Sequence, residues 1–361
     1  MKPVSALLAL VALSFCPASV RAFTAADADA IFDAHTKAFY HLEGDRAWHT
    51  KNTEEGVADF WTRAEQMEMV LDAYERTYDP QRLAMFGQLF RGFVADHTGE
   101  WSKNKYNDDI MWMVIACARA YELSGAPEYL EAARKNFDLC YVRAASPDLG
   151  GGLFWKVDNR SKNACVNGPG AIAAYLVGVA TGEPDYFAKS KDIYLWEKAT
   201  LFDSETGRVA DNISMNGRVS RFALTYNQGT FVGAANLLGY VDDARLAATF
   251  TKERLCRDGF LPGSGEDGDG GGFNGIAARW ISRFMKDRGE QAAFEPWLQK
   301  NADAAWHARR ASDNLVWCHW PEPTPESKRY SWGCSSAVVL LQVAPPPAVP
   351  PSPEPAHDAK E

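Results

Sequence analysis

The chain has 361 residues, of which 46% are hydrophobic and 12% aromatic, enough to bury one large core or two smaller ones. Its formal net charge is −9, and lysines and arginines form no cluster anywhere along it. These features argue against a nucleic-acid-binding protein or one that binds anionic membranes, so we expect a globular protein with neutral partners.

The first 22 residues have the features of a secretory signal peptide. A lysine precedes an apolar stretch that ends at Phe15, and small residues then lead to Ala22. We expect cleavage after Ala22 and a mature protein that is secreted or periplasmic. A lipid anchor at Cys16 is the less favoured alternative, because Phe15 is bulky where such sites carry a small residue. No later stretch has the roughly eighteen uninterrupted apolar residues of a membrane span, so we expect none.

Apolar residues recur at helical spacing along the mature chain, separated by clusters of glycine, proline, asparagine and aspartate. This pattern predicts twelve helices, at residues 25–43, 58–78, 80–97, 107–124, 127–142, 167–181, 185–200, 225–239, 243–256, 274–288, 291–310 and 332–343. Some of these segments, such as IMWMVIACARAY, are apolar nearly all round, whereas others, such as YLEAARKNFDLCYVR, have one apolar stripe. Because helices of the first kind are buried and those of the second kind cover them, we predict an all-α toroid with an inner and an outer ring.

Two connections in this helical pattern contain short strand signals, GGLFWKV at 151–157 and GRVADNIS at 207–214. Long connections often carry function, and we expect the first to form a small β-hairpin over one mouth of the toroid. From residue 344 the sequence is rich in proline and charge, which predicts a disordered tail at 344–361 and a folded domain at 23–343. The cysteines show no zinc-binding spacing and predict no particular disulfide, so we expect no metal site.

Two adjacent aspartates, Asp108 and Asp109, begin one of the apolar helices. Most such pairs only start a helix, since Asn107 is a good N-cap and acidic residues suit a first helical turn. However, the apolar residues that follow include no cation to pair with them. Neighbouring carboxyl groups that face a cavity have their pKa values pushed apart, so that one is ionised while the other keeps its proton.

A glycosidase needs this division of labour, with one carboxyl group as proton donor and the other as nucleophile or base. The Cα atoms of adjacent residues are about 3.8 Å apart. Their carboxyl groups can therefore lie at the roughly 5 to 5.5 Å spacing of retaining enzymes, but hardly at the wider spacing of most inverting ones. The geometry predicts cleavage with retention of configuration.

The segment YNDDIMWMVIACARAYELSG at 106–125 resembles the hallmark segment of glycoside hydrolase family 76, the endo-α-1,6-mannanases and their fungal cell-wall relatives. Further segments resemble the family in the same order, namely DFWTRAEQMEMVLDAYERT (59–77), GGLFWKVDNRSKNACVNGP (151–169), LTYNQGTFVGAANLLG (224–239), the block from Asp269 to Trp280, and WGCSSAVVLL (332–341). The resemblance implies an (α/α)6 barrel, in agreement with the twelve predicted helices.

The resemblance also implies a retaining, endo-acting hydrolase that cleaves α-1,6-mannosidic bonds in mannan. Carried onto this chain, it makes Asp108 the nucleophile and Asp109 the general acid/base. It implies no cofactor, a mannan chain or mannooligosaccharide as the partner, and a protein that works as a monomer.

The matched segments also contain candidates for substrate binding, because aromatic rings can stack on sugar rings and amide groups can bind their hydroxyls. The candidates are Trp61, Trp112, Asn163, Asn167, Tyr226, Asn227, Gln228, Asp269 and Phe273. Trp155, between two of them, could also stack on a pyranose ring. Helix capping explains Asn167 equally well, and core packing explains Trp112 somewhat better than sugar binding does.

The glycine-rich segment PGSGEDGDGGGFNG at 262–275 contains the spacing GxGxxG, but two acidic residues within it would repel a phosphate and no strand signal precedes it. We instead expect it to bring Asp269 and Phe273 to the cleft. After this phenylalanine the family usually has lysine, whereas this chain has Asn274. The departure removes a cation from near the site and leaves the tolerance of decorated mannan open.

Two other functions fit the same residues. A cell-wall mannan transglycosidase would pass the mannosyl group to a sugar acceptor, but fungal relatives with that role often carry a C-terminal hydrophobic anchoring signal, whereas this chain ends in proline and charge. An inactive mannan-binding protein is disfavoured because both carboxylates are present. An epimerase on the same fold would need a suitably placed base such as histidine, and the matched segments contain no candidate.

Overall fold

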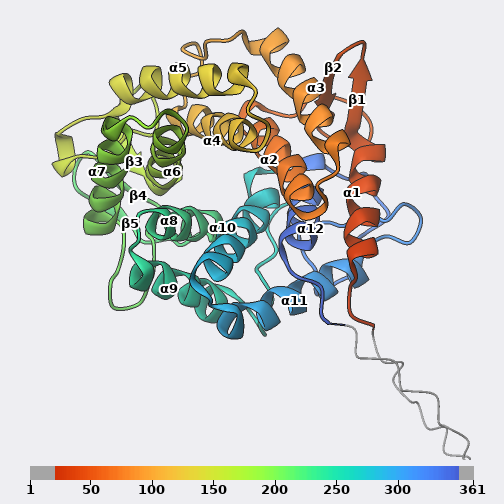
Figure 1. The fold of residues 1–361 in the computed structure, drawn as a ribbon. Coiled ribbons are helices and arrows are strands. Elements are labelled where there is room, and N and C mark those ends of the chain that lie inside the picture. Colours follow the sequence, from red (N-terminus) through yellow and green to blue (C-terminus); the bar gives the residue numbers. More distant parts are fainter. Residues whose placement is uncertain (1–20, 349–361) are drawn as a thin grey trace, which may run out of the picture.

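The computed structural model describes residues 21–348, and most of the predicted signal peptide and of the predicted tail lies outside them. Twelve α-helices occur within this part of the chain (Figure 1). Their bounds are α1 Ala25–Phe39, α2 Phe60–Thr77, α3 Pro80–His97, α4 Asn107–Ser124, α5 Pro127–Ala144, α6 Ala164–Thr181, α7 Pro184–Thr200, α8 Thr225–Leu237, α9 Val241–Phe250, α10 Phe273–Arg288, α11 Gln291–Ala308 and α12 Ser331–Val343. Three single helical turns are η1 Asp148–Gly150, η2 Thr251–Leu255 and η3 Asp269–Gly272.

The even-numbered helices form a closed inner ring, in which each contacts the next from α2 to α12 and α12 contacts α2 again. The odd-numbered helices surround them, with α1 on α12, α3 on α2, α5 on α4, α7 on α6, α9 on α8 and α11 on α10 (Figure 1). Every residue of α12 is buried, whereas α7 buries a stripe along one side. The predicted all-α toroid is therefore confirmed, and its architecture is an (α/α)6 barrel.

Local sequence signals explain how the chain turns from an inner to an outer helix. Helix α4 ends at Gly125, which has φ of 70°, a left-handed conformation that glycine adopts without steric cost. Pro127 then begins α5, as Pro80 begins α3 and Pro184 begins α7. Proline is favoured in a first turn, where its missing N–H is not needed. These short turns bring each outer helix back along its inner neighbour.

Two small antiparallel sheets lie outside the rings. Strands β1 (Tyr40–Glu43) and β2 (Arg46–His49) form a hairpin that the sequence did not predict, so α1 ends four residues before the expected boundary at residue 43. Strands β3 (Ser161–Asn163), β4 (Asn212–Ser214) and β5 (Val219–Ser220) form the second sheet. Strand β4 lies within the strand segment predicted at 207–214.

The hairpin predicted at 151–157 is wrong. Leu153 and Lys156 form only isolated bridge pairs with other segments. Side-chain amides occupy the backbone groups here instead, because Asn167 bonds to both the N–H and the carbonyl of Leu153 and Asn107 donates to the carbonyl of Phe154. The segment therefore lies against two inner helices without becoming a strand.

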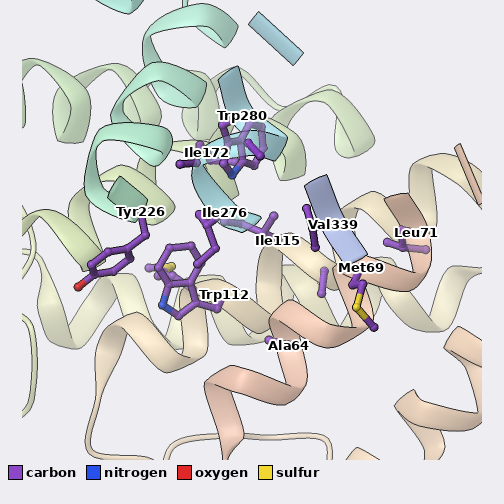
Figure 2. Packing of buried hydrophobic residues seen from close by; sticks show 14 of the residues in the cluster. Ala64, Met69, Leu71, Trp112, Ile115, Ile172, Tyr226, Ile276, Trp280 and Val339 are labelled. Carbon is purple, nitrogen blue, oxygen red and sulfur yellow. The ribbon is translucent and has the colours of Figure 1, made fainter. Parts of the chain in front are cut away.

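The apolar core fills the inner ring and the space between the rings. In Figure 2, Trp112 and Ile115 of α4 approach Tyr226 of α8 and Ile276 of α10. Helix α6 is long and apolar enough to cross a membrane, but 78% of its 18 residues are buried within the protein, as expected for a core helix.

Charged side chains also lie buried inside the barrel. Arg119 of α4 contacts Glu68 and Asp72 of α2, and Arg279 of α10 contacts Glu65 and Asp72, all at 2.6 to 2.8 Å. Because these side chains are almost completely buried, the ion pairs join three inner helices through the centre of the ring.

Candidate functional site

A cavity of about 520 Å³ opens at one mouth of the barrel. It is lined by Asp59, Trp61, Tyr106, Asp108, Asp109, Trp112, Trp155, Asn163, Cys165, Asp211, Tyr226, Asp269 and Phe273. The N-terminal ends of α2, α4, α6, α8 and α10 each contribute to it, so the inner helices run in the same direction and meet at this mouth. We call this cavity the cleft.

The two aspartates singled out by the sequence lie in the first turn of α4 and both line the cleft. The Trp155 indole N–H donates to Asp108 Oδ2 at 3.0 Å. The Asn104 amide donates to Asp109 Oδ2 at 2.9 Å. Asp108 Oδ1 is buried, and among the residues described it has no hydrogen-bond partner.

The surroundings of the pair raise both pKa values. Burial, and then repulsion from Asp109, raises the pKa of Asp108 to about 8, although the neighbouring Cys165 thiol and then the Trp155 indole favour its ionised form. Burial raises the pKa of Asp109 to about 6, against the Asn104 hydrogen bond and with a contribution from Asp269. Near neutral pH the pair therefore holds one proton, as a general acid beside a carboxylate requires.

Asn107 holds the segment that carries Trp155 against the start of α4. Its backbone N–H donates to the Trp155 carbonyl, and its side-chain amide donates to the Phe154 carbonyl, both at 2.8 Å. Its Oδ1 accepts from Arg143 Nε at 2.6 Å. Asn107 is therefore not the N-cap that the sequence suggested, a position taken by Tyr106, but a support for the residue that orients Asp108.

The aromatic candidates form one wall and the floor of the cleft. Tyr226 stacks on Phe273 with ring centroids 3.9 Å apart, and in Figure 2 the Tyr226 hydroxyl points away from the core cluster. Trp61 meets Trp332 edge-on at 4.6 Å and is partly exposed. Trp112 is only 1% exposed, so it packs in the core while one side of it borders the cleft.

The glycine-rich segment brings Asp269 and Phe273 to the cleft, as the sequence predicted. The Trp332 indole donates to the Asp269 carbonyl at 2.8 Å. A Cβ atom on Gly272 would lie 2.1 Å from the Trp332 ring, so only glycine permits this approach. Glu266 ties the same segment to Arg329 through an ion pair.

Three of the predicted amides do not line the cleft. Asn167 and Gln228 are fully buried and bond to backbone groups, including the N–H of Leu153 and of Val209. We therefore correct our expectation that these two bind a sugar, since their amides position the backbone. The third, Asn227, donates to Asp211 at 3.3 Å and so reaches the cleft only indirectly. Asn163, which is the N-cap of α6, does line it.

The sequence did not single out several residues of the cleft. Asp59 and Tyr106 are the first residues of segments that resemble the family, so their position in those segments was a usable signal. Asp211 had none, because it reaches the cleft through the pairing of β3 with β4, which sets Asn163 opposite Asn212. Cys165 lies within the matched segment 151–169, between the candidates Asn163 and Asn167, which was a usable signal for it too. All six cysteines in the described part are unpaired.

Comparison with known proteins places the chain in a family. The profile of glycosyl hydrolase family 76 matches residues 24–349, nearly the whole of the described part. The chain belongs to glycosyl hydrolase family 76. No functionally curated protein matches it.

Solved structures of family 76 members share this fold. An inactive variant of the α-1,6-mannanase of Salegentibacter sp. HEL1_6, in complex with α-1,6-mannotriose, is 30% identical with a TM-score of 0.82, and the match covers 88% of this chain and 98% of that one. In that variant two consecutive aspartates are replaced by asparagine. The family 76 mannosidase Bt3792 of Bacteroides thetaiotaomicron VPI-5482 is 18% identical with a TM-score of 0.77, covering 88% and 96% of the chains.

A fungal structure is also similar. Dfg5 of Chaetomium thermophilum, in complex with glucosamine, is 17% identical with a TM-score of 0.69, and the match covers 81% of this chain and 80% of that one. At this identity the likeness concerns the fold alone. Membership of family 76 identifies this protein as a glycoside hydrolase by family, with an (α/α)6 barrel.

Proposed function

We propose that this family 76 protein hydrolyses α-1,6-mannosidic bonds within mannan chains, with retention of configuration. The observation that carries the proposal is the pair Asp108 and Asp109, which shares one proton at the base of an aromatic cleft. The Salegentibacter α-1,6-mannanase supports the substrate, since its inactive variants lack two consecutive aspartates and are in complex with α-1,6-mannotriose and α-1,6-mannotetrose.

In the proposed mechanism Asp109 gives its proton to the glycosidic oxygen while the Asp108 carboxylate attacks the anomeric carbon. The bond to the leaving sugar breaks and a mannosyl ester of Asp108 forms. Water then attacks the same carbon, Asp109 takes a proton from it, and Asp108 leaves as a carboxylate. Trp155 would hold Asp108 through its hydrogen bond to Oδ2 and so orient the carboxylate for attack.

The division of roles within the pair comes from the family resemblance. The pKa of Asp108 is raised further than that of Asp109, which places the shared proton on Asp108. If Asp109 is the acid, a bound mannosyl unit must shift the proton to it before the bond breaks. Otherwise the roles are reversed, and the experiments below separate the two cases.

The cleft surfaces suit an uncharged polysaccharide. Tyr226, Phe273 and Trp61 offer ring faces or edges to pyranose rings, while carboxylates and the Asn163 amide can accept or donate hydrogen bonds to hydroxyls. Among residues 21–348, no three His, Cys, Asp or Glu side chains are grouped so as to hold a metal ion. The proposed chemistry uses the two carboxyl groups alone.

The first test measures reducing-sugar release and the product profile on linear α-1,6-mannan for the wild type, Asp108→Asn and Asp109→Asn. We expect short mannooligosaccharides from the wild type and a loss of at least about a hundredfold in each variant, with unchanged circular dichroism. Asp267→Asn, a change to an exposed carboxylate outside the cleft, serves as control. Variants that keep wild-type rates would refute the role of the pair.

The roles are assigned by rescue with azide on a mannoside that has an activated leaving group. A variant that lacks the acid/base still forms the mannosyl ester, and azide then yields a product of retained configuration. A variant that lacks the nucleophile is attacked directly and yields the inverted azide. We expect retention for Asp109→Ala and inversion for Asp108→Ala, and the opposite pattern would reverse the assignment.

A mannan transglycosidase is the alternative, and the similarity to the fold of Dfg5 is compatible with it. It would use the same two aspartates and differ only in what attacks the mannosyl ester. Longer products formed when mannooligosaccharide acceptors are added would favour transfer over hydrolysis. Binding of mannan without any turnover would instead indicate an inactive mannan-binding protein.

We also propose that the protein is exported and matures by cleavage after Ala22. Phe23, which would become the first residue, is 1% exposed and packs in the core. Its backbone nitrogen donates to Asp303 Oδ1 at 2.6 Å, a position in which a new amino terminus would meet a carboxylate.

A further inference from the structure

We infer that the cleft selects its substrate by charge, accepting uncharged mannan and rejecting chains that carry a phosphate or a carboxylate near the bond to be cleaved. The inference rests on the proposed function, because it concerns the same cleft. It names a property of the substrate that the family and its relatives leave open.

The lining of the cleft has one sign of charge. Five of its residues are aspartates, from four different segments of the chain, and none is lysine or arginine. Even with one proton on the catalytic pair, the cleft carries several negative charges. Asp211 and Asp269 form no ion pair within the described part of the chain, so no cation offsets them there.

Two lysines approach the rim, and each already contacts a carboxylate, which for Lys51 is that of the cleft residue Asp59. Lys51 lies 3.3 Å from Asp59. Lys156 lies 3.6 Å from Asp158, and its ammonium group sits over the Trp155 ring at 4.7 Å from the centroid. Neither can turn to an anionic ligand without leaving a carboxylate or an aromatic face that already stabilises it.

The position that would most easily supply a cation is neutral and turned away. Asn274 follows Phe273 in α10 but is only 2% exposed. Its Oδ1 accepts from the Thr225 hydroxyl, and its amide donates to the Pro262 carbonyl, both at 2.9 Å. The start of α10 therefore gives the cleft a phenyl ring and no charge.

Electrostatics then sets the preference. A phosphate group carries between one and two negative charges near pH 7. Within a cleft partly shielded from water, repulsion from several carboxylates adds to the cost of stripping water from the anion, and no donor group compensates for either. A neutral sugar meets neither the repulsion nor the cost of removing water from an anion, since its hydroxyls can donate hydrogen bonds to the same carboxylates.

The test compares kcat/KM for three tetrasaccharides at low ionic strength. They are α-1,6-mannotetraose, the same sugar with a phosphate on its terminal 6-hydroxyl, and the same sugar with a neutral acetate ester there. We expect the phosphate to lower kcat/KM at least about tenfold more than the acetate does. Because salt screens the repulsion, the difference should shrink as ionic strength rises.

Two variants of the glycine-rich segment identify the source of the effect. Asp269 lines the cleft and Asp267, two residues away, does not. We expect Asp269→Asn to raise the rate on the phosphorylated sugar relative to the neutral one by about threefold or more, and Asp267→Asn to leave that ratio unchanged.

Equal kcat/KM for the phosphorylated and acetylated sugars, in a protein active on neutral mannotetraose, would overturn the inference and leave the proposed function intact. A difference that does not respond to salt or to Asp269→Asn would overturn it as well, since bulk and not charge would then be responsible. Inactivity on every sugar, the neutral one included, would instead refute the proposed function, on which the inference depends.

Discussion

At the residue scale, the pair Asp108 and Asp109 depends on groups that hold each carboxyl differently. Asp108 is oriented by an indole and Asp109 by an amide, and both lie where protein replaces water. Trp155 is itself fixed through Asn107 and Arg143, so the geometry of Asp108 rests on a chain of three side chains. Such supporting contacts keep reactive groups in one orientation without any contribution from the substrate.

The pair predicts the pH dependence of activity. Below about pH 6 both carboxyl groups are protonated and no nucleophile remains, and above about pH 8 both are ionised and no acid remains. We therefore expect kcat/KM on α-1,6-mannotetraose to be maximal between these values and to fall on both sides. An optimum near pH 4, the range of unperturbed aspartates, would show that the cleft does not raise these pKa values.

At the element scale, the inner helices are joined by charge as well as by apolar packing. Helix α2 turns Glu65, Glu68 and Asp72 into the barrel, where they pair with Arg119 and Arg279. A buried ion pair adds little stability compared with a pair of well-packed apolar side chains. The loss of one partner, however, leaves the other as a buried charge without compensation. These contacts therefore fix how α2, α4 and α10 meet below the cleft.

We expect Arg279→Met to lower the free energy of unfolding by about 3 to 5 kcal/mol, because it leaves buried carboxylates without their cationic partner. Arg283→Met is the matched control, since this residue lies one turn along α10 and its pair with Asp287 is exposed. The control should cost no more than about 1 kcal/mol. Urea unfolding followed by circular dichroism measures both, and equal losses would mean that the internal ion pairs do not hold the helices.

At the scale of the whole molecule, the barrel also binds the segment that precedes α1. Phe23 inserts into the core beside α11, and Thr24 caps α1 through a reciprocal bond with Asp27. The segment ahead of α1 is thus part of the folded unit. At the other end Ala344, placed by the sequence in the tail, is buried and its N–H donates to Leu340.

We expect the exported protein to begin at Phe23, as intact mass and N-terminal sequencing would show. The new ammonium group should then pair with Asp303. Asp303→Asn should cost about 1 kcal/mol more in protein that starts at Phe23 than in protein that keeps Met-Ala before it, where an uncharged amide occupies the place. Equal costs in the two forms, measured by thermal unfolding, would show that no such ion pair exists.

The sequence by itself determined the twelve helices, their alternation between two rings and the adjacent aspartates, because periodicity, caps and turn residues act over a few neighbouring positions. It failed where distant segments compete for the same groups. The sequence predicted that Asn167 and Gln228 bind sugar. In the fold, their side-chain amides form hydrogen bonds with loop backbone groups that have no partner in a helix or strand. Asp211 lies outside the segments that resemble the family, and only the pairing of β3 with β4 brings it to the cleft. Only the tertiary structure decides the charge of the cleft, for the same reason. The aspartates that line it come from segments that are far apart in the chain and adjacent only in the closed barrel.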